Sequence, residues 1–343
     1  MKALVKYSRG YGHVEIRDML PPSPGHGEAL VRVSRAGLCG SDLHIFEDRI
    51  AIPIRVPVVL GHELCGVVSE VGDGVDSAWL GRRVTALPSV HVCGRCHYCR
   101  EGAINLCASR ESMGYWHDGV FASQCVVPER CLRSVPDGIE DGSAALAEPL
   151  ACAVHAVDEV AKIEAGVSVA IIGPGTIGLL CLQVALAAGA QISVYGTDRD
   201  AHRLRLADQL GAQETRVSEN DWDPSTSGDE VDVVFECSGH SEGAGLGLRL
   251  ARREGHYTQV GLFGESPRLD FDTTIVAREL TIRGSFGQRP TSWDRALALL
   301  ADGVVDPGAL ITHVLPLEDW EEGFDICRSG CAGKVVFDTG DRR

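Results

Sequence analysis

With 343 residues, the chain is longer than one ordinary hydrophobic core, and this length predicts two domains. Its 44% hydrophobic and 23% charged residues exclude a disordered chain, and its net charge of −16 disfavours nucleic acid or an anionic membrane as a partner. The amino terminus lacks the features of a secretion signal, and no apolar run reaches about 18 residues. We therefore expect a cytoplasmic protein whose 13 cysteines are reduced thiols or metal ligands.

The N-terminal part, from Met1 to about Val135, consists of short β-type runs separated by glycine and proline. Examples are the runs at 29–33, 66–71 and 83–87. Strands this short, with such punctuation, favour an irregular β-barrel or sandwich over alternating strands and helices.

Several residues between Cys39 and Glu148 have side chains of the types that bind metals. Cys39, Ser41, Asp42 and His44 are followed by His62 and Glu63, and Glu148 comes much later. A thiolate, an imidazole and carboxylates form a mixed site with room for water or substrate, which is the composition of a catalytic zinc site. Taken singly, each residue also fits a plain structural role, such as a buried thiol, a hydrogen-bonded core histidine or a solvated acid.

Four cysteines in one loop have the spacing of a closed tetrahedral zinc site. They are Cys93, Cys96, Cys99 and Cys107. Because such a site leaves no coordination position open, we expect a structural zinc ion that holds a loop without a core of its own. Scattered free cysteines are the alternative, and the acidic charge of the chain weighs against a nucleic-acid zinc ribbon.

The centre of the chain reads as a strand, a tight turn and a helix. The turn carries Gly173, Gly175, Thr176, Ile177 and Gly178. In a dinucleotide-binding turn the first glycine permits the turn, the second lets the backbone approach a pyrophosphate, and the third lets the helix pack on the strand. The N-terminus of the helix offers free N–H groups and a partial positive charge to the phosphates.

A second apolar strand follows and leads to Asp198. A carboxylate here accepts hydrogen bonds from the hydroxyls of an adenosine ribose and repels a 2′-phosphate, so NAD is favoured over NADP. Arg199 keeps NADP open as an alternative, because its guanidinium can pair with a 2′-phosphate.

Strands and helices alternate through this region. We expect them at 167–172, 176–188, 191–196, 200–210, 231–235, 241–251 and 257–261. This succession predicts a doubly wound parallel sheet. A helix near 291–302 and a strand at 334–337 close the chain.

The order of these motifs resembles that of the zinc-dependent medium-chain dehydrogenases of the alcohol dehydrogenase superfamily, nearest to the sorbitol (L-iditol) and threonine dehydrogenase branches. The resemblance covers essentially the whole chain. It implies a GroES-like irregular β-barrel catalytic domain formed by residues 1–150 and 286–343. A Rossmann domain of residues 151–285, which binds NAD, would be inserted between them.

The resemblance also implies roles for single residues. The catalytic zinc ligands would be Cys39, His62, Glu63 and Glu148, with the direct ligand among the two glutamates left open. Asp42 would orient the histidine ligand, Ser41 and His44 would relay a proton, and Arg203 would join the cofactor-binding residues. With the four-cysteine loop, two zinc ions are expected per chain, and the family suggests a homodimer or a homotetramer.

The expected reaction is the oxidation of a polar secondary alcohol, such as a polyol, sugar or cyclitol, to a ketone with hydride transfer to NAD. Trp116, Phe286 and Arg289 are candidates for the substrate pocket. Threonine or another amino alcohol is the alternative substrate. A catalytically silent nucleotide-binding protein and a zinc-free quinone reductase are alternatives of other kinds, and neither explains the metal-ligating residues.

Overall fold

The structure is a computed structural model that describes residues 1–50, 52–218, 228–264, 266–330 and 332–340. The chain divides into two compact units. The first consists of Met1–Glu148, Arg289–Asp302 and Pro307–Arg343, and the second of Pro149–Gln288 and Gly303–Asp306. The C-terminal segment therefore belongs mainly to the same unit as the N-terminal part.

The strands of the first unit range from two to ten residues, and the two longest extend beyond the runs expected at 29–33 and 66–71. Its strands are β1 (Lys2–Lys6), β2 (Val14–Asp18), β3 (Glu28–Gly37), β4 (Val58–Val59), β5 (Glu63–Val71), β6 (Arg83–Ala86), β7 (Gln124–Pro128), β8 (Leu132–Ser134), β15 (Ile311–Pro316) and β16 (Lys334–Asp338). One sheet has the order β2-β1-β4, and the other has the order β15-β16-β3-β5-β6-β8, with β7 also paired to β3.

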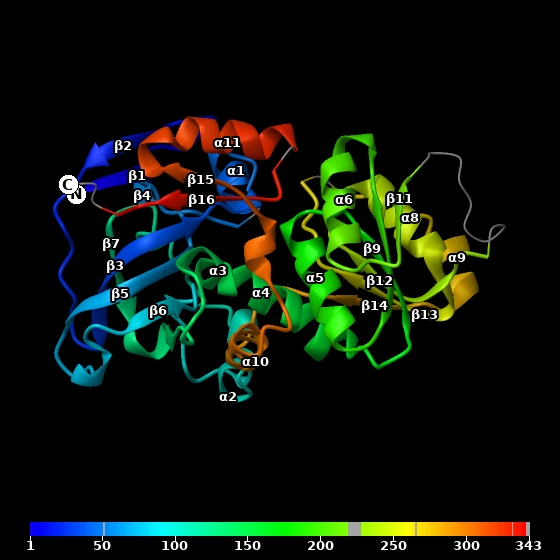
Figure 1. The fold of residues 1–343 in the computed structure, drawn as a ribbon, viewed down its shortest axis with the longest axis horizontal. Helices are drawn as coiled ribbons and strands as arrows, with labels where there is room; N and C mark the ends of the chain where they lie inside the picture. Colours follow the sequence, from blue (N-terminus) through cyan, green and yellow to red (C-terminus); the bar gives the residue numbers. More distant parts are fainter. Residues whose placement is uncertain (51, 219–227, 265, 331, 341–343) are drawn as a thin grey trace. The chain divides into compact units, whose positions relative to one another are not determined.

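The C-terminal strand β16 completes the larger sheet of this unit. It runs antiparallel to β3, with Val336 opposite Gly37, and in Figure 1 the red C-terminal strand lies near the blue N-terminal strands. The side chains of Val335, Val336 and Phe337 are fully buried. Burial of this apolar run is what joins the end of the chain to its beginning.

The second unit contains a six-stranded sheet with the order β11-β10-β9-β12-β13-β14, in which every pair is parallel. Its strands are β9 (Ser168–Ile172), β10 (Gln191–Gly196), β11 (Glu214–Val217), β12 (Val231–Glu236), β13 (Ala251–Gln259) and β14 (Thr281–Gly284). Apolar side chains from both faces of the sheet are buried, as a sheet covered by helices requires. This confirms the predicted doubly wound parallel sheet.

One strand of this sheet is longer than the sequence predicts. The sequence suggests a start at Tyr257, because Arg252, Arg253 and Glu254 interrupt the apolar pattern, whereas β13 begins at Ala251. The three charged side chains are exposed, and a register irregularity separates this part of the strand from the rest. Exposure removes the penalty for charge, so the strand continues where the pattern predicts none.

The helices lie between and around these strands. They are α1 (Gly40–Phe46), α2 (His97–Arg100), α3 (Asp141–Ala145), α4 (Ala147–Val154), α5 (Thr176–Ala187), α6 (Ala201–Gln209), α8 (Ser241–Leu250), α9 (Phe271–Thr274), α10 (Pro290–Ala301) and α11 (Trp320–Ser329). None of the helices in the described part of the chain has both the length and the apolar content to cross a membrane.

Candidate functional site

Cys39, His62 and Glu63 come together because two antiparallel strands meet at one end of the larger sheet of the first unit. β3 and β5 pair with Gly37 opposite Glu63. Cys39 follows the end of β3 by two residues, and His62 immediately precedes β5. The thiol, the imidazole and the carboxylate each offer one ligand atom, and these atoms lie within 4.8 Å of one another.

These three donors suit a zinc ion. Nδ1 of His62 and Oε2 of Glu63 are buried and have no hydrogen-bond partner among the residues that the structure describes. Burial by itself would lower the pKa of His62, but the negative charges of Cys39, Asp42 and Glu148 outweigh it and raise this pKa to about 10. A thiolate, an imidazole and a carboxylate with excess negative charge form a donor set that zinc accepts.

Glu148, the fourth predicted ligand, lies at the start of α4 and is buried. Its charge acts on His62, but Glu148 is not part of the set of donors within 4.8 Å. The structure therefore brings three of the four predicted ligands together and leaves Glu148 nearby.

Asp42 connects the two segments that carry the thiol and the imidazole. It is fully buried, its Oδ2 accepts a hydrogen bond from the N–H of Cys39 at 3.0 Å, and its Oδ1 accepts one from the N–H of Gly61 at 3.3 Å. Oδ1 also lies 4.0 Å from Nδ1 of His62. Cys39 is the N-cap of α1, and Asp42 completes a capping box there.

Glu63 has a partner that the sequence did not reveal, Lys334 at the first position of β16. The Lys334 Nζ lies 2.7 Å from Oε1 of Glu63, and both side chains are buried. The carboxylate fits because its cross-strand neighbour is Gly37, where any side chain would overlap Oε2. Only the pairing of the last strand with β3 brings an ammonium group to this place.

Two aromatic rings lie beside the donors. The ring of Tyr115 is 5.8 Å from that of His62, and Trp116 stacks on Tyr115 at 5.9 Å. Burial raises the pKa of the Tyr115 hydroxyl, as does the negative charge of Cys39, while the Ser41 hydroxyl opposes this rise. Of these two, Trp116 alone was predicted at the pocket, because the sequence does not indicate which of two neighbouring aromatic residues lies beside the metal donors.

The two residues predicted to relay a proton both lie on α1. The Oγ of Ser41 is buried, whereas the side chain of His44 is exposed. Residues three apart on a helix are neighbours on its surface. The pair thus leads from a buried position to the surface of the helix.

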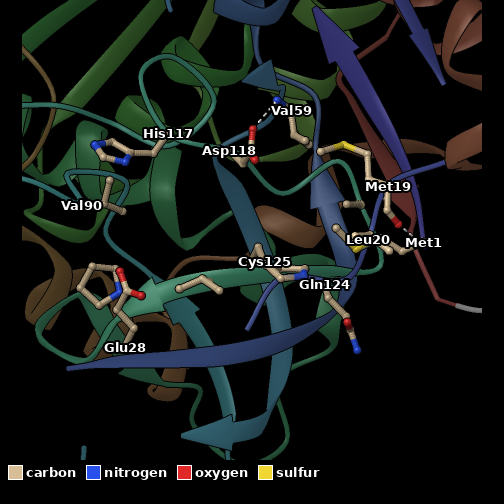
Figure 2. Close-up of a pocket in the computed structure, with 15 residues that line it drawn as sticks. Met1, Met19, Leu20, Glu28, Val59, Val90, His117, Asp118, Gln124 and Cys125 are labelled. Carbon is tan, nitrogen blue, oxygen red and sulfur yellow. Dashed lines mark hydrogen bonds between the residues drawn. The ribbon is translucent and has the colours of Figure 1, made fainter. Parts of the chain in front are cut away.

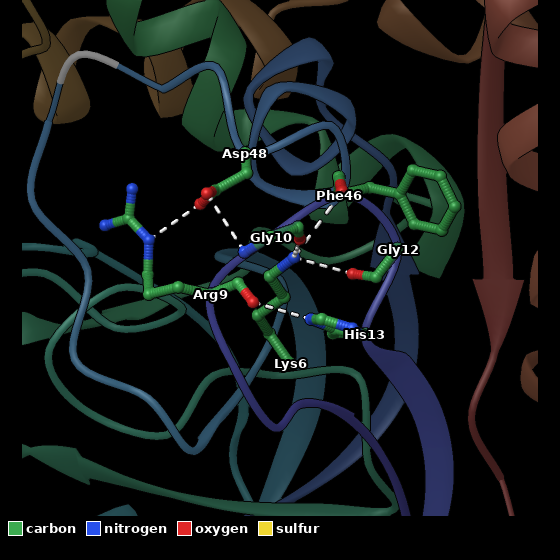
Figure 3. A network of polar contacts seen from close by, with 7 residues as sticks. All are labelled: Lys6, Arg9, Gly10, Gly12, His13, Phe46 and Asp48. Atoms are coloured by element: carbon green, nitrogen blue, oxygen red, sulfur yellow. Dashed lines mark hydrogen bonds and ion pairs between the residues drawn. The ribbon is translucent and has the colours of Figure 1, made fainter.

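The far end of α1 is held by a buried lysine (Figure 3). The Lys6 Nζ donates to the carbonyl oxygens of Gly10 at 2.5 Å and Gly12 at 2.6 Å, and lies 3.5 Å from that of Phe46, the last residue of α1. Asp48 accepts a hydrogen bond from the N–H of Gly10 at 2.9 Å. These contacts fix the helix that carries Ser41 and His44 and is capped by Cys39.

The four cysteines of the predicted structural zinc site also come together. Their sulfur atoms lie within 4.8 Å of one another, and the backbone N–H groups of Cys96 and Cys99 donate to the sulfurs of Cys93 and Cys96 at 3.4 Å. N–H groups of Arg95 and Cys96 lower the pKa of Cys93 to about 6, whereas burial and the neighbouring Cys96 and Cys107 raise the pKa of Cys99, so four thiolates together depend on a bound cation. The helix α2 has no buried residue, and the loop from Cys93 to Cys107 buries only Ala103, Asn105 and Cys107, so it has little core of its own.

The glycine turn has the geometry that its motif predicts. Gly173 has a φ of +92°, and a side chain at Gly178 would overlap the carbonyl oxygen of Gly173. Gly175 is the N-cap of α5, with open space where a side chain would be. Thr176 and Ile177 form the first turn of this helix. The backbone at the N-terminus of α5 is therefore accessible to a phosphate group.

Asp198 lies after β10 in a short 3-10 helix and is exposed, as is Arg199. The N-cap of that helix is supported by Asp200, whose Oδ2 accepts from the N–H of Thr197 at 2.9 Å. Asp200 also pairs with Arg203 at 3.2 Å. Asp198 is therefore not needed for the cap and its carboxylate is available to a ligand.

The remaining candidates for the substrate pocket fall in different units. Phe286 belongs to the second unit, as does Gln288, and Arg289, the N-cap of α10, belongs to the first. Gln288 accepts a hydrogen bond from the thiol of Cys152 at 3.4 Å.

A separate pocket lies in the first unit, among Met1, Met19, Leu20, Val59 and Cys125 (Figure 2). Two of its polar side chains are already engaged. His117 contacts Glu111 at 2.7 Å, and Asp118 accepts from the N–H of Val59 at 2.9 Å. We assign no ligand to this pocket, which shares no residue with the metal donors.

Known proteins resemble the chain along nearly its full length. The alcohol dehydrogenase GroES-like domain matches residues 25–137, and the zinc-binding dehydrogenase domain matches residues 176–302. The sorbitol dehydrogenase of Halalkalibacterium halodurans is 38% identical over 98% of this chain and 99% of its own. The L-threonine 3-dehydrogenase of Bacillus subtilis is 37% identical over 98% of both chains. The crystal structure of a zinc-binding dehydrogenase from Sinorhizobium meliloti 1021 bound to NADP has a TM-score of 0.90, at 33% identity over 98% of both chains.

These matches confirm the predicted fold class, a GroES-like domain joined to a doubly wound parallel sheet. They also agree with the half-buried thiol, the buried imidazole and carboxylate and the glycine turn of the second unit. The chain belongs to the zinc-binding dehydrogenases, a family of oxidoreductases within the alcohol dehydrogenase superfamily.

Proposed function

We propose that the chain is a zinc-dependent dehydrogenase that oxidises a polar secondary alcohol to a ketone, with NAD as the hydride acceptor. The observation that carries this proposal is the donor set of a half-buried Cys39 with buried His62 and Glu63, in a chain whose second unit has a dinucleotide-type turn. A silent nucleotide-binding protein or a zinc-free quinone reductase would have no use for these donors.

The residues of the site would have separate roles in binding zinc and in positioning its ligands. When bound, zinc supplies Lewis acidity toward the alcohol oxygen, and the dinucleotide accepts the hydride. Cys39, His62 and Glu63 would hold the ion, and Asp42 keeps the first two in place through their backbone segments. Glu148 is close enough to serve as an exchanging or water-linked ligand.

Ser41 and His44 would move the alcohol proton. The burial of Ser41 Oγ and the exposure of His44 on the same short helix support a route that ends at solvent. The nearby Tyr115, whose pKa is raised by burial, would stay protonated and line the site.

A second zinc ion would be held by Cys93, Cys96, Cys99 and Cys107. Four thiolates leave no coordination position for a substrate, so its role would be to hold the loop.

NAD is proposed ahead of NADP because Asp198 is exposed and lies two residues after the end of β10. The zinc-binding dehydrogenase of S. meliloti was crystallised with NADP. Arg199 is also exposed, so a comparison of the two cofactors is part of the test below.

For the substrate, a polyol, sugar or cyclitol is our first choice. Relatives with this degree of identity are named for sorbitol and for L-threonine, both of which carry a secondary hydroxyl beside polar groups. We place Trp116, Phe286 and Arg289 at the substrate pocket. An amino alcohol such as L-threonine is the second candidate.

The test is a reduction assay that follows NADH absorbance over polyols, cyclitols, sugar alcohols and amino alcohols, with NAD and with NADP. We expect turnover with at least one polyol-type alcohol and NAD. Cys39→Ser should abolish turnover while dinucleotide binding persists. A matched control is Cys125→Ala, which removes a buried thiol of β7 whose pKa burial raises to about 12. Full activity in Cys39→Ser would refute the zinc mechanism.

We also propose that the chain forms a homodimer or a homotetramer. β14 is an edge strand of the second sheet, its residues are exposed, and Ile282 is 43% exposed. Proteins protect such apolar edges from indiscriminate pairing, and a second copy of the chain would cover this one. Light scattering should give a lower mass for Ile282→Lys than for the wild type. An unchanged mass would show that the contact between copies does not involve β14.

A further inference from the structure

The last residue of β12 is a buried glutamate at the switch point of the parallel sheet. β9 and β12 are neighbours, and the strand order runs from β9 to β10 and β11 on one side and from β12 to β13 and β14 on the other. At such a point the loops that follow the two strands separate, and a ligand crevice forms between them. Glu236 ends β12 and is fully buried.

The carboxylate of Glu236 is held entirely by neutral donors. Oε1 accepts from the N–H of Ser238 at 2.8 Å and from that of Gly239 at 3.1 Å, and also from the Ser238 hydroxyl. Oε2 accepts from the N–H of Gly239 at 3.1 Å and from the amide of Gln259 at 2.6 Å. Among the described residues the carboxylate forms no ion pair, so hydrogen bonds alone hold a buried acid here.

The same residue fixes the loop after the neighbouring strand. The backbone oxygen of Glu236 accepts from the N–H groups of Val260 at 2.9 Å and Gly261 at 2.8 Å. Gln259 is itself positioned by the hydroxyl of Tyr257 at 2.7 Å and by the carbonyl of Gly261 at 2.7 Å. One glutamate therefore connects the carboxyl ends of β12 and β13.

The loop that Glu236 holds lies directly against the glycine turn. A side chain at Gly173 would approach the backbone nitrogen of Ser238 to 2.7 Å, and the N–H of Cys237 donates to the carbonyl of Ile172 at 2.8 Å. Gly239 has a φ of +68° and leaves space for the carbonyl of Leu262. A shift of residues 237–239 would therefore be transmitted to the turn.

We propose that Glu236 is a positioning residue of the dinucleotide site, which acts by holding residues 237–239 and 260–261 against the glycine turn. This inference rests on the proposed function, because it assumes that the turn binds a dinucleotide. The carboxylate does not touch the ligand. In Glu236→Gln an NH₂ group replaces one carboxylate oxygen, and it faces the N–H donor of Gly239 whichever way the amide turns, so the loop must move away.

The test compares Glu236→Gln with Asp232→Asn in the full-length, zinc-loaded protein. Asp232 lies on the same strand, at its other end, and its carboxylate also accepts from a serine: from the N–H of Ser168 at 2.9 Å and the hydroxyl at 2.6 Å, and from Arg252 at 2.7 Å. The Kd for NAD and NADH is measured by calorimetry, together with KM for each substrate. Glu236→Gln should raise the Kd and the KM for the dinucleotide about tenfold, the factor that one lost charge-assisted hydrogen bond produces.

The KM for the alcohol should stay within about twofold in Glu236→Gln, and Asp232→Asn should leave both KM values unchanged. A merely structural role would lower the active fraction, and hence kcat, with both KM values as in the wild type. That result, or equal dinucleotide affinity in Glu236→Gln and the wild type, would overturn the inference.

Gln259→Met is the milder second variant if Glu236→Gln does not fold, since it removes only the amide contact to Oε2. It should raise the Kd for the dinucleotide in the same direction, and an unchanged Kd would also contradict the inference. If the wild-type protein binds no dinucleotide at all, the proposed function itself fails, and this outcome is distinct from a Glu236 variant that binds as well as the wild type.

Discussion

The stability of the first unit depends on the buried ion pair between the Lys334 ammonium and the Glu63 carboxylate. The Nζ lies 2.7 Å from Oε1, and the two side chains are 3% and 0% exposed. Removing one partner leaves a buried charge uncompensated, which typically costs about 3–5 kcal/mol. For a unit of this size, that corresponds to a fall of about 6–20 °C in the unfolding midpoint of Lys334→Met.

The chain supplies its own control in Lys2 and Glu318. This pair also joins the N-terminal strand to the C-terminal segment, at 3.1 Å, but the side chains are 58% and 54% exposed. An exposed pair contributes only about 0–1 kcal/mol, so Lys2→Met should change the midpoint by less than about 4 °C.

The assay is scanning calorimetry of the variants at one pH, ionic strength and protein concentration, with zinc removed by a chelator, because an ion held by Glu63 would itself compensate the carboxylate. The double variant Glu63→Gln, Lys334→Met should recover part of the loss, since neither side then carries an unpaired charge. If Lys334→Met and Lys2→Met unfold at the same temperature, the reasoning from burial is wrong.

Three further predictions concern the metals and the cofactor. Metal analysis should find about two zinc ions per chain. Cys39→Ser should lose one ion without unfolding, whereas Cys99→Ser should lose the other and destabilise the loop. Retention of both ions in either variant would contradict the site assigned to it. Asp198→Ala should weaken NAD more than NADP in calorimetric titrations, because the carboxylate contacts a free ribose hydroxyl; equal effects would place the ribose contact elsewhere. Gly178→Ala should weaken dinucleotide binding at least about tenfold, since the new methyl overlaps the carbonyl of Gly173 and opens the turn; affinity equal to the wild type would show that the turn tolerates this change.

Local patterns predicted four of the six strands of the second unit, β9, β10, β12 and β13, whereas the two edge strands β11 and β14 were not predicted. The apolar runs at β9, β10 and β12 are short and β-branched, and glycine marks the turn between β9 and α5. These signals lie within a few residues of one another, so periodicity and turn chemistry report them directly. The start of β13 was missed because its first charged side chains are exposed.

The spacing of the four cysteines likewise predicted their cluster, because one short loop carries all the ligands. For Cys39, His62 and Glu63, the sequence offered residue types and a family resemblance. The contact between them depends on the register of β3 against β5. This register cannot be predicted from apolar runs that are identified one at a time.

The tertiary structure alone decided the partners that come from distant parts of the chain. Lys334 reaches Glu63 only because β16 pairs with β3, and Tyr115 rather than its neighbour Trp116 lies beside His62 because of how that loop packs. The strand predicted at 231–235 stops one residue short of Glu236, whose hydrogen bonds to two loops appear only when β12 and β13 lie side by side. The sequence by itself therefore determined the local elements, the glycine turn and the residue types of the metal sites. Long-range strand pairing determined which buried charges compensate one another, because a pairing energy depends on distance in space and not on separation along the chain.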